Sequence, residues 1–224
     1  NKQDVLINKV QKTDPDLIVF TGDLIDSRKY DEKPSLILIE ELVQIAPVYF
    51  VTGNHEWKSG KYEELEGKLK ESGARILRNE SVEITQENEK INIIGIDDPT
   101  IVNDNYDETA STEEAINQSI YDLEKGEFNI LLSHRPEMFS LYKQYEFDLV
   151  FSGHAHGGQV RLPFIGGLVA PNQGFFPKFT SGTHTSENTT MIVNRGLGNS
   201  IIPLRIFNRP EIVVVSLTSS SNGD

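Results

Sequence analysis

Short apolar runs that alternate with helix-patterned segments constrain the fold of this chain more than any other feature. Residues 17–22 form a continuous apolar run ending in glycine, a pattern typical of a strand buried on both faces. Residues 33–46 carry apolar side chains at helical spacing, and residues 47–53 form a second apolar run that also ends in glycine. The order strand, helix, strand predicts parallel βαβ units, so we expect an α/β domain with mixed sheets.

The same patterns predict the remaining elements. Further helices are expected at residues 1–12, 61–72, 112–123 and 136–145, and further strands at residues 75–77, 81–85, 91–96, 128–132, 148–152, 191–194 and 212–217. Residues 163–189 are rich in Gly, Pro and Thr and are expected to form a long loop. Neither a repeat nor a linker interrupts the sequence, which predicts a single domain over residues 1–218 and a polar tail over residues 219–224.

Charge and composition exclude several classes of function. The chain has 21 Lys and Arg against 34 Asp and Glu, and its net charge of −13 opposes binding of nucleic-acid polymers. It has no cysteine, which excludes disulfides, cysteine-ligated zinc, iron–sulfur clusters and thiol nucleophiles. An anionic substrate would therefore need local positive charge, which a bound metal ion can supply.

Metal-competent side chains follow four of the predicted strands. They are Asp23 after the first run, Asn54 and His55 after the second, His134 after residues 128–132, and His154 and His156 after residues 148–152. In open α/β sheets, ligands bind beyond the carboxyl ends of the strands. Carboxylate, amide and imidazole groups suit Mn²⁺, Fe²⁺ and Zn²⁺, and a pair of such ions needs a bridging carboxylate, for which Asp23 is suited.

Taken one at a time, several of these residues also fit structural roles. Asp23 suits a turn, Asn54 suits a helix cap, and His134 suits a buried strand end. Their joint occurrence after successive strands favours the metal site. Arg161 and Arg195 suit phosphate neutralisation and equally suit ion pairing at the surface.

Four motifs, in this order, resemble the calcineurin-like metallophosphoesterase superfamily. They are GDxxD at residues 22–26, GNHE at residues 53–56, the strand-end His134, and GHAHGGQ at residues 153–159. With RGLG at residues 195–198, they are similar to the small one-domain bacterial branch. The resemblance covers nearly the whole chain and implies a four-layer α-β-β-α sandwich, an α/β fold with two mixed β-sheets flanked by helices. It also implies a membrane-associated or cell-wall-associated bacterial protein.

The resemblance further implies a role for each motif residue. The implied metal ligands are Asp23 as the bridge between two divalent ions, Asn54, His134 and His154 on one ion, and His156 on the other, while His55 contacts the phosphoryl group in catalysis. The ions expected are Mn²⁺, with Zn²⁺ or Fe²⁺ as alternatives. The implied reaction is hydrolysis of a phosphodiester, pyrophosphate or phosphomonoester bond in a small substrate, by attack of a metal-bridging hydroxide.

The chain departs from the family pattern at one place. The family opens with an Asp-x-His motif after its first strand, and no such motif precedes Asp23. We therefore expect the first strand, this motif and a membrane anchor or export signal upstream of Asn1. If the motif is truly lost, the alternative is a catalytically degenerate scaffold or binding module of the same fold.

A further alternative within the enzymes is a lipid-linked nucleotide-sugar pyrophosphatase, which requires an apolar groove for its substrate. Apolar residues suited to line one are Leu162, Phe164, Ile165, Phe175 and Phe176. The same side chains also suit a role in covering the core or contacting another molecule, which we consider the better interpretation of the sequence.

Overall fold

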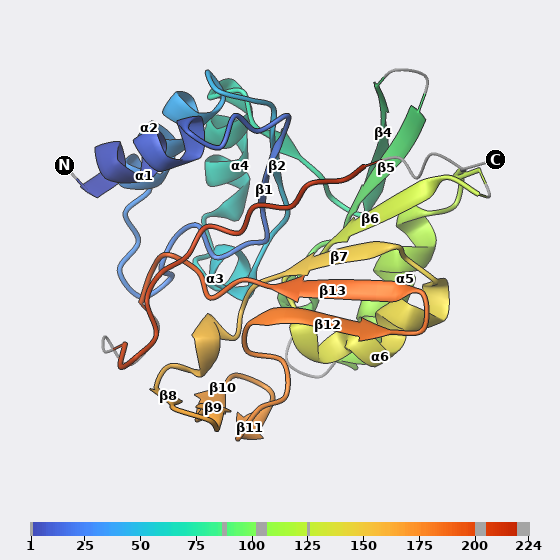
Figure 1. The fold of residues 1–224 in the computed structure, drawn as a ribbon. Coiled ribbons are helices and arrows are strands. Elements are labelled where there is room, and N and C mark those ends of the chain that lie inside the picture. Colours follow the sequence, from blue (N-terminus) through green and yellow to red (C-terminus); the bar gives the residue numbers. More distant parts are fainter. Residues whose placement is uncertain (1, 87–88, 102–106, 125, 200–204, 219–224) are drawn as a thin grey trace.

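In the computed structural model, two β-sheets lie face to face and helices cover the outer face of each sheet (Figure 1). The structure describes residues 2–86, 89–101, 107–124, 126–199 and 205–218, so the predicted tail at residues 219–224 lies outside the described residues. The expected α-β-β-α sandwich is confirmed. Over these residues, every helix is too short or too polar to cross a membrane.

The first sheet contains three parallel strands, β1 (Ile18–Phe20), β2 (Val48–Phe50) and β3 (Arg75–Ile76), in that order. Its outer face is covered by the helices α1 (Lys2–Gln11), α2 (Lys33–Leu42) and α4 (Tyr62–Glu71). The apolar stripes of α2 and α4 bury Ile39, Leu42, Leu65 and Leu69 together with Phe50. The parallel pairing of β1 and β2 across α2 confirms the predicted βαβ unit.

The second sheet is mixed and has the order β12-β13-β7-β6-β5-β4. Its strands are β4 (Glu80–Gln86), β5 (Glu89–Gly95), β6 (Phe128–Leu132), β7 (Leu149–Ser152), β12 (Gly182–Ser186) and β13 (Thr189–Val193). The four central strands run parallel, and β4 and β12 pair antiparallel at the edges. Helices α5 (Glu108–Ser119) and α6 (Phe139–Tyr142) cover its outer face.

Alternate side chains of β2 enter two different cores. Val48 and Phe50 pack against the helices, whereas Tyr49 packs between the sheets with Ile93 and Ile130 of the second sheet. Because both faces of β2 are buried, the strand has no polar alternation. This explains why the sequence shows a continuous apolar run here.

The structure corrects the predicted start of α5. The helix begins four residues before Thr112, because the Asp107 carboxylate accepts hydrogen bonds from the N–H groups of Thr109 and Ala110 and caps it. The segment predicted as one helix at residues 136–145 is instead α6 between the 3-10 turns η2 (Pro136–Met138) and η3 (Lys143–Tyr145). A third 3-10 turn, η1 (Pro99–Ile101), follows β5.

Two predictions for the second half of the chain were wrong. Residues 163–189 are not one long loop, because they contain β12 and the short strands β9 (Gly166–Gly167), β10 (Val169–Ala170) and β11 (Gly174–Phe175). Strand β9 pairs with β8 (Arg161–Leu162), and β10 pairs with β11. Residues 212–217 form neither helix nor strand, although their apolar run is typical of a strand.

Candidate metal centre

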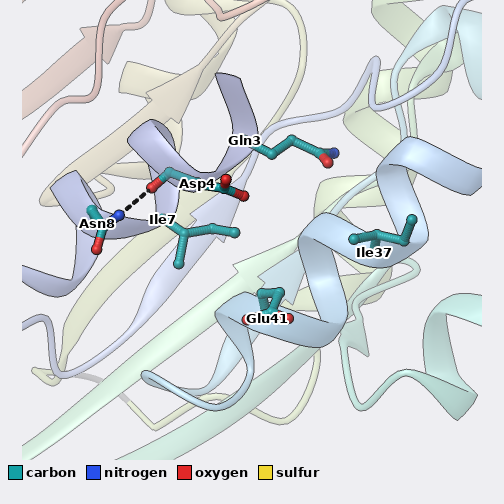
Figure 2. Close-up of a pocket in the computed structure, with 6 residues that line it drawn as sticks. All are labelled: Gln3, Asp4, Ile7, Asn8, Ile37 and Glu41. Atoms are coloured by element: carbon teal, nitrogen blue, oxygen red, sulfur yellow. Dashed lines mark hydrogen bonds between the residues drawn. The ribbon is translucent and has the colours of Figure 1, made fainter. Parts of the chain in front are cut away.

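A surface pocket between α1 and α2 (Figure 2) is lined by Gln3, Asp4, Ile7, Asn8, Ile37 and Glu41. The Asn8 amide donates a hydrogen bond of 2.7 Å to the main-chain oxygen of Asp4 there. This pocket contains no histidine and lies between helices of the outer layer. The side chains suited to hold a metal ion lie at the strand ends instead.

The loops that follow β1 and β2 touch each other through two glycines. A Cβ atom on Gly22, whose φ is +88°, would lie 2.4 Å from the nitrogen of Gly53. A Cβ atom on Gly53 would lie 2.4 Å from Oδ1 of Asp23 and 2.8 Å from Cε1 of His134. Residues without a side chain are therefore required at both positions, and they let Asp23 and His134 approach the loop after β2.

The carboxylate of Glu56, which is fully buried in α3 (Asn54–Lys58), organises the loop after β1. Its Oε2 accepts hydrogen bonds of 2.7 Å from the N–H groups of Gly53 and Asp23, and its Oε1 accepts bonds of 2.8 and 3.3 Å from Leu24 and Ile25. Burial and the nearby Asp23 charge raise the pKa of Glu56 to about 7, although the hydrogen bonds from Gly53 and Asp23 act to lower it. The network holds Asp23 in the left-handed region, at a φ of +56°.

Asp23 and His134 form the centre of the site. Oδ2 of Asp23 lies 3.2 Å from Nε2 of His134, and Nδ1 of His134 lies 2.6 Å from the carbonyl oxygen of Thr21, to which it donates. Burial acts to raise the pKa of Asp23, but His134 and His55 lower it below the usual range. Burial also acts to lower the pKa of His134, yet the Asp23 charge and hydrogen bond raise it to about 9.

His154 completes a group of three potential ligands. Within the described part of the chain, Asp23, His134 and His154 each offer one ligand atom, and these atoms all lie within 4.8 Å of one another. Nδ1 of His154 lies 2.9 Å from Nε2 of His134, so two ring nitrogens point at the same space. Burial and the charges of His134 and Arg135 lower the pKa of His154 well below its usual value, which keeps its imidazole neutral and able to bind a cation.

Two more predicted ligands carry buried polar atoms that have no hydrogen-bond partner among the described residues. These atoms are Oδ1 of Asn54 and Nδ1 of His156. Burial lowers the pKa of His156 to about 4, so the imidazole is neutral at neutral pH and one of its two nitrogens is a lone-pair donor. Buried acceptors without a partner are rare in native proteins. A divalent cation accepts ligands of both types, so the donor set fits the metal that the sequence predicts.

The two histidines after β7 lie in a turn and not in a strand. His154 has a φ of +60° and His156 a φ of +46°. The 3-10 turn η4 (His156–Gly158) continues with left-handed Gly157 and Gly158. The directions of the two side chains are therefore set by the turn and not by the two-residue period of a strand. His156 does not belong to the group of three described above.

Comparisons with known proteins identify the family. The model of the calcineurin-like phosphoesterase family matches residues 2–158. The chain belongs to the calcineurin-like phosphoesterase family. It is 33% identical to the metallophosphoesterase YkuE of Bacillus subtilis over 222 residues, which cover 96% of this chain and 72% of that protein. It is 31% identical to the metallophosphoesterase YkoQ of the same organism, covering 88% of this chain and 70% of that protein.

A third relative is longer than this phosphoesterase chain. The metallophosphoesterase Cj0846 of Campylobacter jejuni is 33% identical over 97% of this chain, which spans 54% of the Campylobacter protein. Family membership confirms the predicted resemblance and makes the chain a hydrolase of phosphoric esters in a metal-dependent family. The group formed by Asp23, His134 and His154 is where the described chain is best suited to hold a metal ion.

His55 lies beside this group and is held through one ring nitrogen. Its main-chain N–H donates to Oδ1 of Asp23 at 2.9 Å, and its Nδ1 accepts a hydrogen bond of 3.0 Å from the N–H of Ser27. The Oδ1 atom of Asp26 lies 3.5 Å from the same Nδ1. In neutral His55 the proton is therefore on Nε2.

Sequence reasoning gave no role to Glu56, Asp26 or the buried ion pairs around Arg135. The Arg135 guanidinium binds the buried Asp98 carboxylate at 2.5 and 3.0 Å and lies 3.4 Å from Oε1 of Glu137. That same Glu137 oxygen lies 4.0 Å from Nε2 of His154. The sequence offers one indication of roles for Glu56 and Asp26 in this phosphoesterase, which is that they belong to the GNHE and GDxxD motifs. Their contacts could not be predicted, because each residue binds a partner that is distant in sequence or across a turn.

The two arginines considered for phosphate binding already have partners in the structure. Arg195 forms an ion pair with Glu211 at 3.2 Å. Arg161 donates hydrogen bonds of 3.1 Å to the carbonyl oxygen of Gly157 and 3.3 Å to Oγ1 of Thr180. The contact of Arg195 agrees with the ion-pairing interpretation, whereas the hydrogen-bond partners of Arg161 are uncharged groups.

Proposed function

We propose that this phosphoesterase uses two bound divalent ions to hydrolyse small phosphorylated substrates, and that both ions are Mn²⁺. Asp23 would bridge the ions, with Asn54, His134 and His154 on one and His156 on the other. The observation that carries the proposal is the group of Asp23, His134 and His154, whose ligand atoms lie within 4.8 Å of one another. Beside it in the predicted ligand set are the buried Oδ1 of Asn54 and Nδ1 of His156, for which the described residues provide no hydrogen-bond partner.

When bound, divalent ions polarise phosphoryl oxygens and lower the pKa of a water nucleophile. The chain's own groups prepare the site for them. The hydrogen bond from Nδ1 of His134 to the carbonyl oxygen of Thr21 orients the ring so that Nε2 faces the carboxylate of Asp23. His55 keeps its Nε2 proton for a phosphoryl or leaving oxygen, because Ser27 occupies its Nδ1.

The test replaces Asp23 with Asn in the full natural protein. We expect loss of bound Mn²⁺, measured by metal analysis, and a fall of about 100-fold or more in hydrolysis of p-nitrophenyl phosphate or bis(p-nitrophenyl) phosphate. Asp14→Asn is a matched control, because Asp14 is exposed and also has a left-handed backbone, with a φ of +47°. Its metal content and activity should not change.

Two results would contradict the proposal. Retention of metal and activity in Asp23→Asn would exclude Asp23 as the bridge. Wild-type protein that binds Mn²⁺ but hydrolyses neither ester, nor a pyrophosphate, would favour the degenerate binding module instead. The ratio of rates on the monoester, the diester and the pyrophosphate identifies the substrate class.

A further inference from the structure

Exposed apolar side chains gather on two small hairpins, β8–β9 and β10–β11, which project from one end of the second sheet (Figure 1). Phe164 is fully exposed, Phe175 is 81% exposed, and Ile165 and Phe176 are more than half exposed. These side chains therefore do not cover the core. Phe207, which is 76% exposed, follows a bridge between Val160 and Ile206 at the base of β8. We call Phe164, Ile165, Phe175, Phe176 and Phe207 the aromatic patch.

Three members of the aromatic patch have an uncommon backbone conformation. Phe164, Phe176 and Phe207 have φ values of +68°, +53° and +52°, in the left-handed region. Bulky residues are outliers there, and Gly or Asn usually occupies such turn positions. A large aromatic side chain that is both strained and exposed gains little from the fold itself. A binding partner outside the chain gives a physical reason for its presence.

The segment of the chain that carries the aromatic patch has the opposite net charge to the residues that precede it. Residues 157–186 contain no Asp or Glu at all. Residues 157–218 carry five Lys or Arg and two Asp or Glu, a net charge of +3, whereas residues 1–156 carry 16 and 31, a net charge of −15. Lys178 and Arg209 are exposed close to the patch in sequence. A surface that attracts this end of the molecule and repels the other is therefore anionic.

We propose that the aromatic patch docks on the surface of an anionic lipid bilayer. Phe side chains enter the boundary between headgroups and acyl chains, while Lys and Arg bind the anionic headgroups. A second copy of the chain fits less well, because a two-fold contact through this patch would bring its cations together. Projecting hairpin tips also suit a fluid bilayer better than a rigid flat partner.

The aromatic patch adjoins the candidate metal centre, so docking would fix the orientation of the site. Turn η4, which contains His156, leads directly into β8. The backbones of Gly158 and Gly167 touch, since a Cβ atom on Gly158 would lie 2.4 Å from Cα of Gly167. Asn208, next to Phe207, donates a hydrogen bond of 2.6 Å to the carbonyl oxygen of His156. The docking itself does not depend on the proposed catalytic function.

The test measures co-sedimentation of the chain with vesicles of phosphatidylcholine alone or mixed with phosphatidylglycerol. We expect binding to the anionic vesicles and a loss of about tenfold or more in the double variant Phe164→Asn/Phe176→Asn. Asn tolerates the left-handed backbone at both positions, so this variant should keep its fold. The control is Tyr121→Asn, since Tyr121 is an 85% exposed aromatic residue elsewhere on the surface, and it should bind like the wild type.

The cations are tested separately with Lys178→Gln/Arg209→Gln, which should weaken binding to the anionic vesicles at low salt. The proposal is overturned if the wild type does not bind anionic vesicles, or if Tyr121→Asn lowers binding as much as the patch variant. It is also overturned if the wild type forms a concentration-dependent dimer in light scattering that Phe164→Asn/Phe176→Asn abolishes, because the patch is then a contact between copies.

Discussion

The same substitution, Gly to Ala, should have opposite effects at Gly53 and at Gly67. At Gly53 the new methyl group would lie 2.4 Å from Oδ1 of Asp23 and 2.6 Å from the nitrogen of Asp23. Ordinary contacts of a methyl carbon start near 3.4 Å, so the loop after β1 must move by about an ångström. At Gly67, inside α4, no described residue lies within 4 Å of the added carbon, apart from the chain neighbours and the backbone of the helix itself.

The magnitudes follow from these two environments. Overpacking costs about 1–3 kcal/mol, so Gly53→Ala should lower the free energy of unfolding by that amount. Ala is favoured over Gly in a helix interior by about 0.5–1 kcal/mol, so Gly67→Ala should raise it. For a chain of this length, 1 kcal/mol shifts Tm by about 2–4 °C. Gly53→Ala should also lose Mn²⁺ affinity, because its methyl group competes for the space next to Asp23.

Urea denaturation of both variants and the wild type, with and without Mn²⁺, provides the measurement. The m values should agree, so that differences in midpoint report stability. A Gly53→Ala variant within about 0.5 kcal/mol of the wild type and with unchanged Mn²⁺ affinity would refute the close approach of the two loops. A destabilised Gly67→Ala variant would refute the reasoning about open space in α4.

Three further predictions concern the groups around the site. Glu56→Ala removes the acceptor of four N–H groups and should lower the free energy of unfolding, measured by urea denaturation, by about 3–5 kcal/mol. Glu71 is exposed, and Glu71→Ala should lower the same quantity by under about 0.5 kcal/mol. Glu137→Ala removes the carboxylate beside Nε2 of His154 and should lower Mn²⁺ affinity about 10–100-fold by calorimetry, with Glu146→Ala unchanged. Mn²⁺ at about 100 times its Kd should increase the free energy of unfolding by about 2.7 kcal/mol and raise Tm by about 5–11 °C. The Asp23→Asn variant should show no such increase.

The sequence predicted the strands and the position of the site because both depend on local patterns. A strand buried on both faces must be apolar throughout, and its carboxyl end must be polar where ligands bind, so Asp23, Asn54 and His134 were visible as strand-end residues. The run at residues 212–217 has the same local pattern but forms no strand. Strand formation also requires a neighbouring strand with free N–H and C=O groups, and the local sequence contains no information on that neighbour.

The supporting contacts could not be predicted because they join residues far apart in sequence. Glu56 binds the N–H of Asp23 across 33 positions, and Arg135 binds Asp98 across 37. A glutamate at the third position of a short helix is ordinary in sequence, since acidic residues are favoured in the first turn of any helix. Only the contact with a second loop shows that this carboxylate holds the proposed metal ligand in place.

Backbone strain at the proposed ligands supports a role beyond folding. Asp23, His154 and His156 all have positive φ values, although His is less suited to this conformation than Gly or Asn. Such positions cost on the order of 1–3 kcal/mol each, and the site adds the buried, unpaired atoms of Asn54 and His156. A chain selected for stability alone would place Gly or Asn at these turns and would pair the buried atoms. The positive φ values and the unpaired atoms both belong to proposed metal ligands, and a bound cation would satisfy the ligand atoms that these turns hold in position.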